Sequence, residues 1–515
     1  MSARRIVLLV LCLAVPTGLD AAGVPLADAA GRGDLAAVRA LLAKGVDVNA
    51  PQVDGTTALH AAVGNDHLQI ADALLKAGAK AATGDRYGVM PLSLAAINGN
   101  TAMIRRLLDA GADPNTVDPA GETVLMTAAR TGTPEALRAL IDRGARVDAR
   151  DPEFQQTALM IAVRENHPTA VDLLLRAGAT VNAQTRKGPT PAFTPPCKGT
   201  GCGSEGVGIN RGGLPDRGRR AEAKGGMTPL LYAARDGRPE VARVLIAAGA
   251  DIELADANGI RPLLTSVLNN HLDVARLLIE KGANVNADDF WGRSPLWAAV
   301  EYRNLDMNNR DQDSPKDNGV DRAPILDFIA LLLDRGANVN ARTREVPPSR
   351  RWLYSLGDVS WVDFTGQTPF LRAALSADTA TMRLLLEHGA DPNLATPAGT
   401  TPLMAAAGVN WVVAQTYTES PQAQIDAVML CLERGADVNA TNSMGLTALI
   451  GAANRGSNDI IELLVKRGAR LDIKDKEGRT PHRWAEGVFL AAVGAEYKPS
   501  TIAVLDRLTA EASKK

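Results

Sequence analysis

The chain has 515 residues, more than one hydrophobic core usually supports, so it consists of several domains or of one repetitive array. Apolar residues make up 46% of it but aromatic residues only 4%, which favours an array built from thin layers of Ala, Leu, Val and Ile. The 56 basic and 58 acidic residues give a formal charge of −2, which excludes a strong overall field for nucleic acid or an anionic membrane.

The first 23 residues are predicted to be an export signal. Arg4 and Arg5 form a basic start, and residues 6–15 form an apolar run that is too short to span a bilayer. Small residues at Ala21 and Gly23 suit cleavage, so we expect the mature chain to begin within a few residues of Gly23. No later segment has the roughly 18 uninterrupted apolar residues that a membrane helix needs. The sequence therefore predicts an exported protein, periplasmic or secreted, without a membrane span.

A repeat of 33 residues follows the signal. Its first marker is a glycine that is able to end a helix in the left-handed conformation. Most intervals between these glycines are 33 or 34 residues, and four exceed 33 by 38, 21, 20 and 13 residues, which predicts four insertions. The glycines are Gly45, Gly78, Gly111, Gly144, Gly178, Gly249, Gly282, Gly336, Gly389, Gly435 and Gly468.

The second marker is a triplet like Thr-Pro-Leu, which predicts the start of a helix. Thr or Ser is able to cap the free N–H groups of a first turn, and Pro at the first helical position loses no hydrogen bond. Each unit is therefore a turn, a short helix, a tight turn and a second helix. The eleven triplets begin at Thr57, Met90, Thr123, Thr157, Thr228, Arg261, Ser294, Thr368, Thr401, Thr447 and Thr480.

This unit resembles the ankyrin repeat. The resemblance combines the period of 33, the triplet, paired alanines as in Gly399–Ala406, and a closing G-A-D-V-N-A as in Gly435–Ala440. It implies an all-α solenoid of about 12 helix-turn-helix units, with β-hairpin finger turns along one edge of a groove. Residues 25–50 are expected to cap the array, and its last helix is expected at about Thr501–Leu508.

The four insertions divide the array. Two of them lengthen the turns that join units, so we expect enlarged fingers there, and two lengthen the turns inside units. The predicted segments are the signal at 1–23, repeats 1–5 at 24–183, an insertion at 184–224, repeats 6–8 at 225–342 with an insertion at 303–323, an insertion at 343–365, repeats 9–12 at 366–510 with an insertion at 411–423, and a tail at 511–515.

The insertion at 184–224 is basic and rich in Gly and Pro. It carries eight basic against three acidic residues, a charge of +5 in a chain that is acidic elsewhere. An acidic partner or a phosphate-like anion is one interpretation, with Arg217, Arg219 and Arg220 as the candidate contacts. A solvated flexible loop is the other interpretation.

Two cysteines of this insertion, Cys197 and Cys202, have a spacing that suits a local disulfide or half of a zinc site. The segment has no histidine, and the remaining mature cysteine, Cys431, is expected in the core, so the disulfide is the prediction. The pattern G-x-G-x-x-G at Gly201–Gly206 lacks the preceding strand and following helix of a dinucleotide site, so no cofactor is predicted.

No catalytic residue or metal ligand is predicted. The six histidines have no metal-binding spacing, and the resemblance implies that His60 joins a helix to a turn by hydrogen bonds. Carboxylates recur at the turns, which is typical of turn chemistry rather than of a catalytic pair. They are Asp54, Asp118, Asp256, Asp289, Asp363 and Asp475.

Aromatic residues concentrate between 290 and 417, where 12 of the 19 rings lie. Phe328 and Phe370 fall at core positions of helices, and Trp297 replaces a histidine of the repeat pattern, so packing is expected for all three. Other rings fall on adjacent fingers, where they form either an interface hot spot or a private mini-core of the long finger. The candidate partner-binding rings are Phe290, Trp291, Trp352, Tyr354, Trp361 and Phe364.

The predicted function is that of an exported, monomeric scaffold that binds a protein partner through its groove and enlarged fingers. No enzymatic activity, cofactor, metal or nucleic acid is predicted. The alternative is an enzyme or metal-binding protein whose site is built in the insertion at 184–224.

Overall fold

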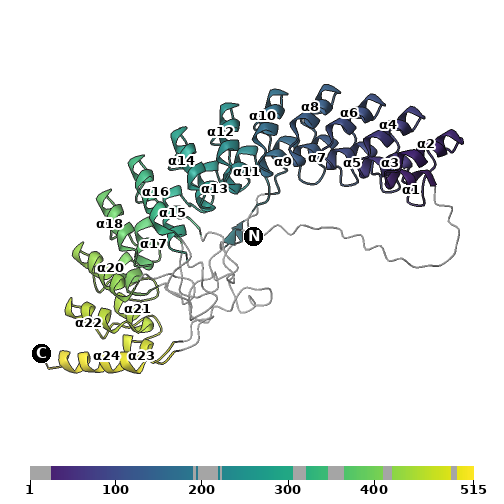
Figure 1. Cartoon of the computed structure of the whole chain (residues 1–515). Helices are drawn as coiled ribbons and strands as arrows, with labels where there is room; N and C mark the ends of the chain where they lie inside the picture. The colour runs from purple at the N-terminus through teal and green to yellow at the C-terminus, as the bar shows by residue number, and fades with distance from the viewer. Residues whose placement is uncertain are drawn as a thin grey trace, which may run out of the picture. The chain divides into compact units, whose positions relative to one another are not determined.

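The computed structural model describes residues 25–189, 193–194, 219–220, 223–305, 321–345, 365–409, 420–488 and 496–514. The chain forms two compact units, residues 1–153 with 176–179 and residues 154–175 with 180–515. Within each unit the described chain runs through successive pairs of short helices (Figure 1). The described residues contain twelve such pairs, which confirms the predicted all-α repeat fold.

In the first unit, the first helix of each pair packs on the first helix of the next, and second helices pack on second helices. Two layers of helices result, with the core between them. The helices are α1 (Pro25–Gly31), α2 (Leu35–Ala43), α3 (Ala58–Gly64), α4 (Leu68–Lys76), α5 (Pro91–Ile97), α6 (Thr101–Asp109), α7 (Val124–Thr131) and α8 (Pro134–Asp142).

The second unit continues the same pairing. Its helices are α9 (Ala158–Arg164), α10 (Pro168–Arg176), α11 (Pro229–Asp236), α12 (Pro239–Ala247), α13 (Pro262–Leu268), α14 (Leu272–Glu280), α15 (Pro295–Arg303), α16 (Arg322–Asp334), α17 (Pro369–Leu375), α18 (Thr379–Glu387), α19 (Pro402–Ala407), α20 (Pro421–Glu433), α21 (Ala448–Arg455), α22 (Asn458–Lys466), α23 (Pro481–Ala485) and α24 (Pro499–Ala512). The described residues of this unit also form two strands, β1 (Phe193–Thr194) and β2 (Arg219–Arg220).

The helices begin where the triplets place them. Thr228 has extended backbone angles, and its hydroxyl accepts a hydrogen bond from the Leu231 N–H at 3.0 Å, while Pro229 occupies the first helical position. The second helices end at the glycines. Gly249 has a φ of +87°, and the Ala250 N–H bonds to the Leu245 carbonyl at 3.0 Å, which closes the end of α12.

Small and branched apolar side chains fill the core, as the low aromatic content indicates. Phe328, Phe370 and Trp297 are all buried, which confirms their predicted packing role. Two second helices that follow insertions, α16 and α20, have 13 residues each, whereas the regular second helix α14 has 9. Part of each insertion inside a unit therefore lengthens a helix.

The fingers are narrow turns held by backbone hydrogen bonds. In one of them the Asp85 N–H bonds to the Val89 carbonyl at 3.0 Å, and the Asp85 carboxylate accepts the Tyr87 and Val89 N–H groups. This finger stacks on the preceding one, because the Arg86 N–H donates a hydrogen bond to the Asp54 carbonyl at 3.0 Å. Turn N–H groups are also accepted by Asp54, Asp118, Asp256, Asp289 and Asp475, which confirms the predicted turn role, whereas Asp363 lies outside the described residues.

An asparagine in the closing segment of a repeat joins it to the following repeat. The Asn49 side chain donates to the Gly78 carbonyl at 3.1 Å and accepts the Lys80 N–H at 2.8 Å. This pair of bonds satisfies two backbone groups at the end of the next second helix, which otherwise have no partner within the helix. The same arrangement recurs at Asn115, Asn182, Asn286, Asn340 and Asn439.

His60 joins a helix to the next finger, as the resemblance implies. Its Nδ1 accepts the Thr57 N–H at 3.2 Å, and its Nε2 lies 3.1 Å from the Val89 carbonyl. Burial lowers the pKa of His60, so the folded protein favours the neutral ring.

Acidification is expected to weaken the first unit through this ring. The pKa of His60 is lower in the folded state than in the unfolded state, so the stability it contributes is present above about pH 6.5 and is lost as the pH falls. His60→Met is the matched variant, because Met126 holds the same repeat position and its sulfur accepts the Thr123 N–H. Urea unfolding at neutral and mildly acidic pH is expected to show a smaller loss for the variant, and equal losses would contradict the assignment.

Candidate functional site

The finger that contains Phe290 and Trp291 presents one ring and buries the other. The Phe290 side chain is 39% exposed, whereas Trp291 is 1% exposed. The burial of Trp291 favours the mini-core interpretation for this ring, whereas Phe290 remains available for an interface. Asp289 accepts the Trp291 N–H at 3.0 Å and pairs with Arg293 at 2.6 Å, and the Arg293 guanidinium lies 5.2 Å from the Trp291 ring centre.

The following finger is anchored on the carbonyl of this tryptophan. The Arg344 N–H bonds to the Trp291 carbonyl at 2.7 Å, and the Arg344 side chain pairs with Asp288. The other end of the insertion at 343–365 returns to Thr343, whose carbonyl accepts the Gly366 N–H at 2.9 Å. The candidate residues Trp352, Tyr354, Trp361 and Phe364 lie outside the described residues, so their role stays a prediction.

The ends of the basic insertion pair as an extension of a finger. The Thr185 N–H bonds to the Met227 carbonyl at 3.0 Å, and the Gly188 N–H bonds to the Lys224 carbonyl at 2.8 Å. Further along, β1 pairs with β2 in antiparallel register, with Phe193 opposite Arg220 and Thr194 opposite Arg219. Arg217, Cys197 and Cys202 lie outside the described residues, and only the backbone of Arg219 and Arg220 is described.

Exposed apolar side chains gather at the fingers of both units. The described residues contain seven large apolar side chains that are exposed, and five of them lie in or beside finger turns. Of these five, only Phe290 was predicted from the sequence. The signal for the others is an apolar residue three to six positions before a triplet. The five are Val53, Tyr87, Val117, Phe154 and Phe290.

In one repeat of the first unit, the first helix also has an exposed apolar side chain. Tyr87 precedes the triplet at Met90 by three residues and is 71% exposed, and Ile97, at the end of α5, is 59% exposed. Leu94 lies one helical turn before Ile97 and is half-buried. Tyr87 and Ile97 therefore offer an aromatic and an aliphatic contact from the same repeat.

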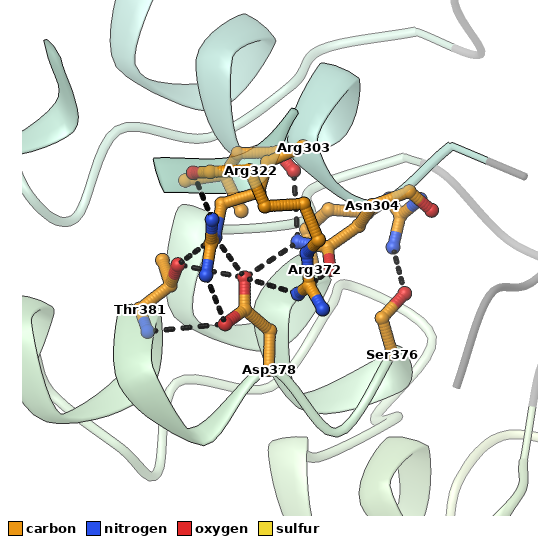
Figure 2. Close-up of polar contacts among 8 residues, drawn as sticks. Arg303, Asn304, Arg322, Arg372, Ser376, Asp378 and Thr381 are labelled. Carbon is orange, nitrogen blue, oxygen red and sulfur yellow. Dashed lines mark hydrogen bonds and ion pairs between the residues drawn. The ribbon is translucent and has the colours of Figure 1, made fainter. Parts of the chain in front are cut away.

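A buried polar cluster connects α15, α16, α17 and α18 in the second unit (Figure 2). The Asp378 carboxylate is fully buried and pairs with Arg303 at 2.9 Å and with Arg322 at 3.3 Å. It also accepts hydrogen bonds from the Asn304 amide at 3.1 Å and from the Thr381 hydroxyl at 2.7 Å. Asp378 therefore holds the two ends of the insertion at 303–323 against the start of α18.

A second buried arginine stabilises the same cluster. Arg372 of α17 pairs with Glu301, and it donates to the Ser376 hydroxyl at 2.8 Å and to the Asn304 carbonyl at 3.2 Å. Burial alone would raise the pKa of Asp378, but the Arg303 and Arg322 guanidiniums hold that pKa below its usual value. The carboxylate is thus ionised and fully engaged, which fits a structural role rather than proton transfer.

The described part of the chain contains no group of three His, Cys, Asp or Glu side chains placed to hold a metal ion. Cys431 is buried in α20, as expected for a core residue, and burial raises the pKa of its thiol to about 12. Among the described helices, none is long and apolar enough to cross a membrane.

Comparison with known proteins identifies repeats along most of the chain. A family model of three ankyrin repeats matches residues 26–118, 92–185, 230–309 and 419–487, and a model of a single ankyrin repeat matches residues 365–394. Among solved structures, the ankyrin repeat domain of human ASB11 is 25% identical and covers 50% of this chain and 98% of its own, with a TM-score of 0.39. No curated protein matches the chain.

Proposed function

Because this chain belongs to the ankyrin-repeat family, we propose that it is an exported scaffold that binds a protein partner through its groove and fingers. Ankyrin repeats generally mediate contacts between proteins. The observation that supports this role most directly is the placement of five exposed apolar side chains at finger turns. Single exposed apolar residues are ordinary, but their recurrence at one kind of turn is typical of an interaction edge.

Export is the part of this proposal that depends on the sequence alone. Arg4 and Arg5 followed by the apolar run at 6–15 support it, and these residues lie outside the described part. In an oxidising compartment we propose a disulfide between Cys197 and Cys202. N-terminal sequencing of protein from the cell envelope tests the export signal, and mass spectrometry after alkylation tests the disulfide.

Replacement of Tyr87 and Ile97 by alanine is expected to weaken partner capture. Truncation of an interface hot spot costs at least about 2 kcal/mol of binding free energy, roughly a thirtyfold loss of affinity. Both side chains are exposed, so thermal unfolding is expected to change little. The partner is cross-linked to the protein and captured from periplasmic extract of the cell that exports it. The affinity of each variant is then measured by titration with the recovered partner.

Tyr497→Ala is the control, because that tyrosine is 64% exposed and lies just before α24 in the other unit. Capture by the control is expected to equal that of the unmodified protein. Equal loss in both variants would mean that exposed tyrosine, and not this repeat, determines the binding. Stoichiometric metal in the purified protein would instead support a site in the insertion at 184–224.

A further inference from the structure

We infer that a basic surface in the second unit, formed by Phe154, Arg164, Lys187 and Lys224, binds an acidic, extended segment of the protein partner. The inference rests on the proposed function, partner binding, and names the chemistry of what is bound. It follows from three observations: the arrangement of cations on α9 and α11, the side chains at the base of the basic finger, and the excess of cations over carboxylates around them.

The floor of the basic surface is a tyrosine between two arginines. The guanidinium of Arg164, in α9, lies 5.7 Å from the centre of the Tyr232 ring, and that of Arg235, in α11, lies 4.8 Å from it. Gln156 accepts a hydrogen bond from Arg164 at 3.2 Å and donates one to the Tyr232 hydroxyl at 3.2 Å. Helices α9 and α11 are neighbours, so two consecutive repeats contribute to one charged patch (Figure 1).

The edge of the basic surface is made by two stacked fingers. The exposed Phe154 lies on one finger, and its carbonyl accepts the Arg186 N–H from the next finger at 2.8 Å. Lys187 and Lys224 are exposed on the paired ends of the basic insertion. The Lys187 side chain crosses Gly226, where an added Cβ would lie 2.8 Å from the lysine Cε. Gly226 therefore leaves room for the lysine.

The cations of this surface outnumber the carboxylates. Arg164, Lys187 and Lys224 form no ion pair with any other described residue. Arg235 pairs with its neighbour Asp236 at 2.7 Å, the exposed Glu165 follows Arg164 directly, and the exposed Glu153 precedes Phe154 directly. This surface is thus positively charged, although the formal charge of the whole chain is −2. A partner segment with Asp and Glu side chains would be electrostatically complementary to it.

A protein segment fits this surface better than a nucleic acid. Sequence-independent binding of single strands uses exposed aromatic faces on which bases stack. The Tyr232 ring is only 5% exposed and lies between guanidiniums, and Phe154 is the remaining aromatic side chain of the surface. One apolar contact at Phe154 beside several cations is suited to a peptide with one apolar anchor among acidic residues.

The test uses the full chain and a labelled synthetic peptide that contains one tryptophan among glutamates. A lysine counterpart of the peptide, a labelled single-stranded oligonucleotide and vesicles with anionic lipid are the alternative probes. The glutamate peptide is expected to bind more tightly than the others, with an affinity that falls as salt rises. The triple variant Arg164→Gln, Lys187→Gln, Lys224→Gln is expected to bind it at least about tenfold more weakly.

The matched control removes the same charge from the first unit with Lys44→Gln, Lys76→Gln and Lys80→Gln, three exposed lysines. The control is expected to keep the affinity of the unmodified chain. Equal weakening by both triple variants, equal binding of the two peptides, or preferred binding of the oligonucleotide or vesicles would overturn the inference. Partner capture that depends on Tyr87 and Ile97 is measured separately. The proposed function is therefore kept if capture is observed but the glutamate peptide does not bind.

Discussion

Replacement of Asp378 by asparagine is expected to lower the free energy of unfolding of the second unit by about 3–5 kcal/mol. The change preserves the shape of the side chain and its ability to cap α18, because asparagine caps helices as well as aspartate does. It removes the negative charge that Arg303 and Arg322 share, and it leaves two arginine side chains that are only 6% and 15% exposed without that charge. Urea unfolding and hydrogen exchange at α15–α18 measure the loss.

The control for this prediction is Asp34→Asn. Asp34 caps α2 through the Ala37 N–H at 2.9 Å, and the bond is exposed to solvent. Its replacement is expected to change stability by no more than about 0.5 kcal/mol. A loss below about 1 kcal/mol in Asp378→Asn would mean that the two arginines rely on other partners or reach water, and that the cluster is not held by this carboxylate.

Replacement of Trp291 by alanine is expected to lower the free energy of unfolding by about 3–5 kcal/mol, as for other large buried aromatic side chains. The side chain is fully buried beside Arg293, and its indole N–H has no hydrogen-bond partner among the described residues. The loss therefore comes from packing. The measurement is thermal or urea unfolding, with partner capture assayed on the same protein.

Phe290→Ala is the matched control, since the two rings are neighbours on one finger. Phe290 is partly exposed, and its ring lies close to Gly259, so we expect a loss of about 1 kcal/mol or less. Unchanged unfolding together with weakened capture in Trp291→Ala would show that this ring contacts the partner. Strong destabilisation with normal capture would assign Trp291 to the finger's own core.

The fold could be predicted from the sequence because each repeat carries its own local signals. The triplet sets the start of a helix, as at Thr228, and the closing glycine sets the end, as at Gly249. These signals act within a few residues, so no long-range information is needed. Spacing between them also predicts the insertions.

The buried side of a finger could not be predicted in the same way. Tyr87 and Trp291 both lie three residues before a triplet, yet the first is exposed and the second is buried. What differs is their surroundings. The Trp291 finger has a buried Asp289–Arg293 pair and supports the backbone of Arg344, more than fifty residues away in the sequence.

The sequence contains one signal for the polar cluster. Arg372 occupies the repeat position where Ala61 and Ala405 lie in other units, so a charged residue replaces a small one on the first helix. That exchange indicates an altered packing layer. Its partners were not predictable from the pattern, because Glu301 lies 71 residues away and the pairing depends on how consecutive repeats stack.

The asparagine that six of the closing segments carry bears on how such a chain is able to grow. The Asn49 side chain bonds to the repeat that follows it, and the Asn439 side chain does the same near the other end. Duplication of a repeat that carries this asparagine therefore supplies its own connection and needs no compensating change at distant positions. Gene duplication is expected to lengthen the array in whole repeats, and a deletion that starts and ends at equivalent residues is expected to leave the asparagine bonds of the remaining repeats in place.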